Sequence, residues 1–147
     1  MKDIHTLLKL LRFASFQDYV LPDTLLSDNI DWRAVYALAL HQGISAIVLD
    51  AIGRLPKEIR PSKPMLLQWI GQATMMEQMY AKHRWLISSL ASVYAKDGIR
   101  MLLLKGYGCS LCYKKPEHRP TGDIDVYLFG RQDEADILVE KQLGIKV

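Results

Sequence analysis

The strongest constraint on the fold is a long helical stripe of apolar residues that ends abruptly at Gly98. Between Met65 and Lys96, apolar side chains recur every three or four residues: Leu66, Trp69, Ile70, Ala73, Met76, Tyr80, Ile87, Leu90 and Tyr94. This spacing places them on one face of a single helix, which at 1.5 Å per residue would be about 45 Å long. After Gly98 the apolar residues form short runs bounded by glycines, a pattern that favours strands.

The residues before the long stripe predict shorter helices. The predicted segments are residues 3–14, a turn and short helix within 21–32, a helix over 32–41, and another over 44–55. Asp31 is a suitable N-cap for the helix over 32–41, and Gly43 follows its end. The apolar run in 44–55 also suits a strand, so the helix there competes with a second interpretation.

The residues after Gly98 predict alternating strands and helices. In order, they are a buried strand (99–104), a helical turn (107–113), a polar loop (114–122), a strand (123–129), a helix (132–143) and the start of a third strand (144–147). We therefore expect an α+β fold. An N-terminal helical region over residues 1–97 would pack on an incomplete β-α-β core over residues 98–147.

Two carboxylates stand one residue apart in the second of these strands. Side chains alternate between the faces of a strand, so Asp123 and Asp125 would point the same way. Two carboxylates this close repel each other unless a cation lies between them. Mg²⁺ suits such a pair, because it binds one or two carboxylates together with substrate phosphates. The alternative is an edge strand that carries two solvated aspartates.

Cations precede these carboxylates. Lys105 and Gly106 follow the first strand, and Arg119 stands four residues before Asp123. Cations beside metal-binding carboxylates are typical of a site for a nucleoside triphosphate. Lys114 and Lys115 are expected to lie in a solvated loop.

These segments resemble a known family. The stretches "LLLKGYGCSLCY" (102–113) and "PEHRPTGDIDV" (116–126) resemble an uncharacterised nucleotidyltransferase family of the DNA-polymerase-β-like superfamily. Further upstream, "WRAVYALALHQGISAIVLDAI" (32–52) resembles the helical segment that precedes the core in such proteins. The most specific part of the likeness is "LLLKG" with "RPTGDIDV".

The resemblance implies an activity and roles for five residues. The activity is Mg²⁺-dependent transfer of a nucleoside monophosphate from an NTP, ATP above all, to a hydroxyl acceptor. Asp123 and Asp125 would bind Mg²⁺ in a two-metal site, Gly106 would begin a turn that faces the phosphates, and Lys105 would reach a phosphate. Arg119 would orient phosphate or brace the aspartates.

The same resemblance indicates that the site is incomplete. The superfamily has a third carboxylate on a later strand, and "GIKV" stops before any acid appears there. We therefore expect this chain to be a fragment or a shortened product that is inactive alone and able to dimerise through an exposed sheet edge. The alternatives are a non-catalytic nucleotide-binding domain and a helical protein-interaction module. The acceptor stays open between a small molecule, a protein and RNA.

Composition adds limits on location and partners. No apolar run approaches the roughly 20 residues that span a bilayer, and a net charge of +3 is too small to argue for nucleic-acid binding. A cytoplasmic location without membrane contact is expected. Cys109 and Cys112 have the spacing of half a zinc site or a redox pair, but we expect reduced, buried or half-buried helix cysteines.

Overall fold

The computed structural model describes residues 2–22 and 29–144. The elements are α1 (Lys2–Ser15), α3 (Trp32–His41), α4 (Ser45–Arg54), η1 (Lys57–Ile59), α5 (Lys63–Lys96), β1 (Leu102–Leu103), α6 (Tyr107–Ser110), η2 (Pro116–His118), β2 (Val126–Tyr127) and α7 (Gln132–Leu143). The described residues are predominantly helical with a small sheet, which agrees with the α+β class.

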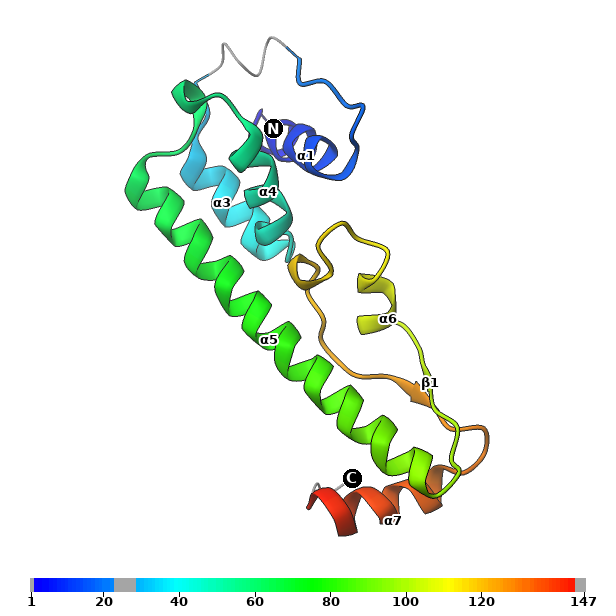
Figure 1. Ribbon diagram of the computed structural model, residues 1–147. Helices are drawn as coiled ribbons and strands as arrows, with labels where there is room; N and C mark the ends of the chain where they lie inside the picture. Colours follow the sequence, from blue (N-terminus) through cyan, green and yellow to red (C-terminus); the bar gives the residue numbers. More distant parts are fainter. Residues whose placement is uncertain (1, 23–28, 145–147) are drawn as a thin grey trace.

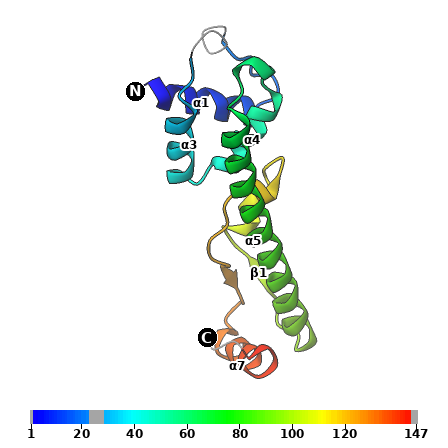
Figure 2. The same ribbon diagram turned by 90° about the vertical axis from the view of Figure 1, so that its left-hand side faces the viewer.

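Helix α5 runs the length of the molecule. In Figures 1 and 2, α1, α3 and α4 gather around its N-terminal half, while α6 and the two strands lie beside its C-terminal half. Helix α7 packs across the C-terminal end. The helix predicted from the apolar stripe is confirmed, and it supports both parts of the chain.

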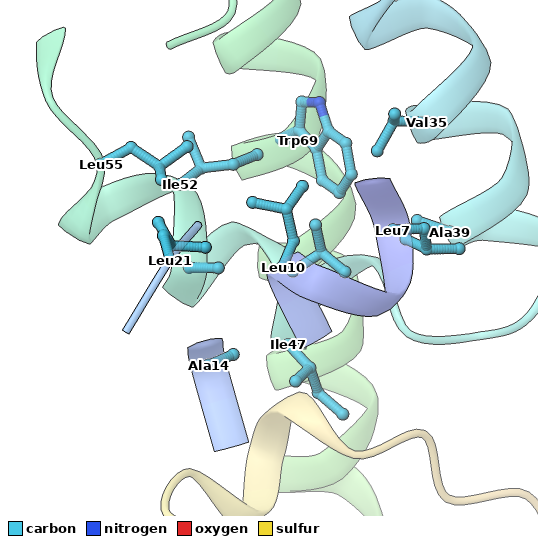
Figure 3. Close-up of a cluster of buried hydrophobic side chains, with 12 residues drawn as sticks. Leu7, Leu10, Ala14, Leu21, Val35, Ala39, Ile47, Ile52, Leu55 and Trp69 are labelled. Carbon is cyan, nitrogen blue, oxygen red and sulfur yellow. The ribbon is translucent and has the colours of Figure 1, made fainter. Parts of the chain in front are cut away.

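The first hydrophobic core holds the N-terminal helices on α5. Figure 3 shows its side chains, with Trp69 of α5 among residues from α1, α3 and α4. Trp69 is fully buried, and its ring meets Tyr36 edge-on with the ring centroids 4.9 Å apart. The predicted cap of α3 is confirmed, since Asp31 Oδ1 accepts hydrogen bonds from the backbone N–H groups of Arg33 and Ala34.

A second core lies at the other end of α5. It consists of Val93, Tyr94, Ile99, Leu128, Ala135 and Val139. These residues come from α5, the segment after it, the position directly after β2, and α7. Their burial fixes the sheet and α7 against the C-terminal half of α5.

The sheet is smaller than the sequence predicts. β1 and β2 pair antiparallel, with Leu102 opposite Tyr127 and Leu103 opposite Val126. One further backbone hydrogen bond extends this pairing: the N–H of Leu104 donates to the carbonyl oxygen of Asp125 at 2.9 Å.

The prediction of a buried first strand is wrong. Leu102 and Leu104 are 49% and 43% exposed, because one face of this two-stranded sheet packs on the second core and the other faces solvent. The strand alternative for residues 44–55 is also wrong, since they form α4. The predicted turn and helix within 21–32 fall largely on 23–28, and the predicted third strand on 145–147, both outside the described residues.

Candidate functional site

Gly106 brings the end of the first strand against the segment that carries the aspartates. Its backbone has φ +72° and ψ −109°, a conformation open to glycine and strained for other residues. A Cβ at this position would lie 2.9 Å from the carbonyl oxygen of Asp123. The two backbones therefore approach each other more closely than any side chain allows.

The two aspartates lie just before β2 rather than inside it. Asp123 is exposed and Asp125 is partly exposed. The Nζ atom of Lys105 is 3.7 Å from Oδ2 of Asp125. Lys105 is thus placed beside a candidate metal ligand, and its exposed amine can turn towards a bound phosphate.

Arg119 contacts the glycine turn rather than the aspartates. Its Nη1 donates to the carbonyl oxygens of Gly106, at 2.8 Å, and Pro120, at 3.2 Å. The guanidinium therefore holds Gly106, which in turn lies against Asp123. Arg119 was predicted either to orient a phosphate or to brace the aspartates. These contacts favour the second role, in which Arg119 acts on Asp123 through Gly106.

Helix α6 anchors the glycine turn on α5. The rings of Tyr107 and Tyr80 are stacked with centroids 4.8 Å apart. The fully buried Ser110 places its Oγ 3.2 Å from the hydroxyl oxygen of Tyr80. Helix α6 has only four residues, so its dipole is too weak to make its N-terminus a phosphate site. A phosphate at this place would therefore contact the backbone of Gly106.

A buried histidine near the motif was missed as a functional candidate. His118 is 4% exposed. Its Nδ1 lies 2.8 Å from Oδ2 of Asp50 on α4, and its Nε2 lies 3.0 Å from Oε1 of Glu77 on α5. Lys115 lies in a solvent-exposed loop, as predicted, and its Nζ also contacts the other oxygen of Asp50 at 2.5 Å. We call these four residues the His118 cluster.

Ion pairing shifts the pKa values within the His118 cluster. The hydrogen bond to Asp50 raises the pKa of His118 above its usual range, although burial of the ring opposes this, and the bond to Glu77 adds to the rise. Burial works to raise the pKa of Asp50, but the hydrogen bonds from His118 and Lys115 outweigh it and hold that pKa below its usual range. The charged forms of both side chains are therefore favoured.

No spacing in the sequence reveals this cluster. Its carboxylates precede His118 by 68 and 41 residues. The one sequence feature that could have drawn attention to His118 is its position directly before Arg119 and Pro120 of the family motif.

The cysteine prediction needs correction. Cys109 and Cys112 are free, as expected, but both are exposed rather than buried. Cys109 lies in the short helix α6 and Cys112 in the turn after it, where solvent reaches both side chains. Within residues 2–22 and 29–144, no group of three or more His, Cys, Asp or Glu side chains is arranged to hold a metal ion.

The carboxylates that are present suit one Mg²⁺ ion bound together with a nucleotide. Asp123 and Asp125 supply hard oxygen ligands with access to solvent, and triphosphate oxygens and water normally complete the shell of Mg²⁺. These two residues would hold the ion, and the ion would neutralise charge on the phosphates.

Comparison with known proteins gives one match. A family model described as "uncharacterised nucleotidyltransferase" matches residues 28–139, which is more than half of the chain. The chain belongs to this family. The match includes the glycine turn, the His118 cluster and both aspartates.

Membership of a nucleotidyltransferase family implies a nucleoside triphosphate as a substrate and transfer of a nucleoside monophosphate in general terms. Nucleotidyltransferases generally use divalent metal ions. No curated protein and no solved structure matches the chain. Among the described helices, none is both long and apolar enough to cross a membrane.

Proposed function

We propose that residues 102–126 form the metal- and triphosphate-binding part of a nucleotidyltransferase site of the DNA-polymerase-β-like type. Asp123 and Asp125 bind Mg²⁺ with the triphosphate of ATP or another NTP, and Lys105 contacts a phosphate. The observation that carries the proposal is the contact of Gly106 with the Asp123 backbone. This contact joins the two most specific motifs of the family in one place.

The proposed reaction is attack of an acceptor hydroxyl oxygen on the α-phosphorus of the NTP. A new oxygen–phosphorus bond forms, and the bond from the α-phosphorus to the bridging oxygen breaks. Pyrophosphate leaves with the bonding electrons, and the hydroxyl proton passes to a base. In this chemistry Asp123 and Asp125 orient the triphosphate, while Arg119 and Gly106 keep Asp123 in place.

A non-catalytic nucleotide-binding role is the second candidate. Two-metal transfer uses a further carboxylate to hold the ion that activates the acceptor, and the part of the chain that the structure describes brings no third acidic side chain to Asp123 and Asp125. We therefore expect this chain alone to bind NTP weakly and to transfer little. Metal-dependent transfer from a radiolabelled NTP that is lost in Asp123→Asn would favour the enzyme, and NTP binding without transfer would favour the non-catalytic role.

The test compares ATP binding by calorimetry with and without Mg²⁺. Asp125→Asn should abolish the Mg²⁺-dependent binding, because it removes a charged ligand while keeping the side-chain shape. Asp133→Asn is the matched control, since it removes one exposed carboxylate from α7, away from the motifs. Equal Mg²⁺-dependent binding by the wild type and both variants would show that Asp125 does not bind the metal ion.

Self-association through the sheet remains part of the proposal. In the described residues β1 and β2 pair only with each other, so each strand has a free edge. Light scattering during gel filtration would show a dimer if the edges pair. A monomer at all protein concentrations would contradict this part.

A further inference from the structure

The geometry of the His118 cluster favours the protonated form of the ring. Each ring nitrogen lies within hydrogen-bond distance of a carboxylate, one on α4 and one on α5. An ionised carboxylate is only an acceptor. Both nitrogens must therefore carry a proton for both contacts to be hydrogen bonds to ionised carboxylates, so this geometry favours the imidazolium form of the buried ring.

The residues after His118 connect this ring to the proposed metal ligands. Arg119, the next residue, donates to the carbonyl of Gly106, and Gly106 lies against the carbonyl of Asp123. Thr121 gives a second attachment to α5, because its Oγ1 lies 2.8 Å from Nδ1 of His83. Residues 118–123 are thus held on the helical region at one end and on the glycine turn at the other.

We propose that His118 is a positioning residue for the nucleotide site, because its two ion pairs hold residues 118–123 on α4 and α5 and so hold Asp123 beside Gly106. This inference deepens the proposed function and rests on it. His118 would touch neither the metal nor the nucleotide, and it would act through Arg119 and the backbone that follows.

The groups around the ring set how the site responds to pH. Asp50 of α4 and Glu77 of α5 favour the imidazolium, and Lys115 opposes it through its positive charge. A cavity of about 300 Å³ borders the cluster, and its other ionisable lining residues are Cys112, Tyr113 and Lys114.

The effect of pH follows from the direction of the pKa shift. The stabilisation is fully present below the pKa of an unfolded histidine, about 6.5, and it is lost as the pH rises through the raised pKa of His118. A neutral ring can donate only one hydrogen bond, so deprotonation leaves one carboxylate facing a bare nitrogen.

The experiment measures the affinity for Mg²⁺·ATP of the full chain between about pH 6 and pH 9, the range in which a raised histidine pKa titrates. The wild-type affinity should fall about 10- to 100-fold as His118 loses its proton, the loss typical of removing a partner that orients a metal ligand. Glu77→Gln should move the midpoint of this fall to lower pH, because the amide still accepts a hydrogen bond but no longer favours the cation.

Glu117→Gln is the matched control. It removes one carboxylate from η2 beside His118, and no contact of Glu117 with the ring is seen among the described residues. Its binding profile should therefore overlay that of the wild type. A merely structural role for His118 would leave the midpoint unmoved in Glu77→Gln, and that result would overturn the proposal.

Hydrogen exchange gives a readout that does not depend on nucleotide. Amides of residues 119–125 should exchange faster in His118→Gln than in the wild type, and faster in the wild type at high pH after correction for the intrinsic rate. Unchanged exchange in His118→Gln would show that the ring positions nothing. If His118→Gln does not fold, the pH dependence of Mg²⁺·ATP affinity in Glu77→Gln decides whether His118 positions the site.

Failure of the proposed function is distinguishable from failure of this inference. No Mg²⁺-dependent ATP binding by the wild type at any pH would make the proposed function wrong, and with it the role of His118 there. Binding with the same affinity and pH profile in the wild type, Glu77→Gln and His118→Gln would make only the role of His118 wrong.

Discussion

Replacement of Gly106 by alanine tests whether the two family motifs must touch. The new Cβ would lie 2.9 Å from the carbonyl oxygen of Asp123. That oxygen belongs to backbone, so no flexible side chain can move away to make room. The residue also has φ +72°, which alanine adopts only under strain.

The magnitude is a balance of three effects. Strain at such a backbone conformation costs about 1–3 kcal/mol, and overpacking against fixed atoms costs about 1–3 kcal/mol more. Alanine also lowers the conformational entropy of the unfolded chain, which stabilises the folded state by about 0.4–1 kcal/mol. The free energy of unfolding should therefore fall by about 1–6 kcal/mol, because strain and overpacking outweigh the gain.

Urea denaturation followed by circular dichroism measures this change. With a denaturant slope of about 2 kcal/mol per molar urea, the midpoint of Gly106→Ala should fall by about 0.5–3 M. Gly108→Ala is the matched control, because it makes the same substitution in α6 where a Cβ meets Leu103 at an ordinary 3.6 Å. Its midpoint should be unchanged or higher, since alanine favours a helix over glycine.

Two results would refute this reasoning. Equal midpoints for Gly106→Ala and Gly108→Ala would show that the close contact with Asp123 does not exist in solution. A large loss of stability with unchanged Mg²⁺·ATP affinity would show that the contact exists but does not position the metal ligands.

Three further substitutions test other parts of the account. Arg119→Ala should weaken Mg²⁺·ATP binding more than Lys114→Ala, because Arg119 holds the Gly106 carbonyl; equal small losses would show that only diffuse charge matters. Cys109→Ser/Cys112→Ser should leave metal content and ATP binding unchanged, and stoichiometric zinc lost in the double variant would contradict this. Trp69→Ala should cost about 3–5 kcal/mol of stability in urea denaturation, and a cost below 1 kcal/mol would show that the first core is not packed around this ring.

The helices could be predicted because their signals are local. The stripe along α5 and the cap at Asp31 are read within a few residues. The residues of the stripe are buried or half-buried in the structure except Ile70, which is 44% exposed. The strands were harder, since the extent of pairing depends on neighbours: the exposed Leu102 and Leu104 have the same local pattern as a buried strand.

The candidate site was predicted in part for the same reason. Gly106 and Asp123 belong to short motifs that the sequence displays directly, although their contact is a tertiary feature. The ion pairs of His118 join residues from three separate elements. A single sequence carries no record of such a pairing, so the cluster became visible only in the folded chain.

The most direct test of the central claim uses Mn²⁺ in place of Mg²⁺. Bound Mn²⁺ broadens the NMR signals of nearby amides, so it reports where the ion lies. With ATP present, we expect selective broadening at residues 104–107 and 122–126, and its loss in Asp125→Asn. Broadening that avoids these segments, or that persists unchanged in Asp125→Asn, would contradict the claim that Asp123 and Asp125 bind the metal of a metal–triphosphate complex.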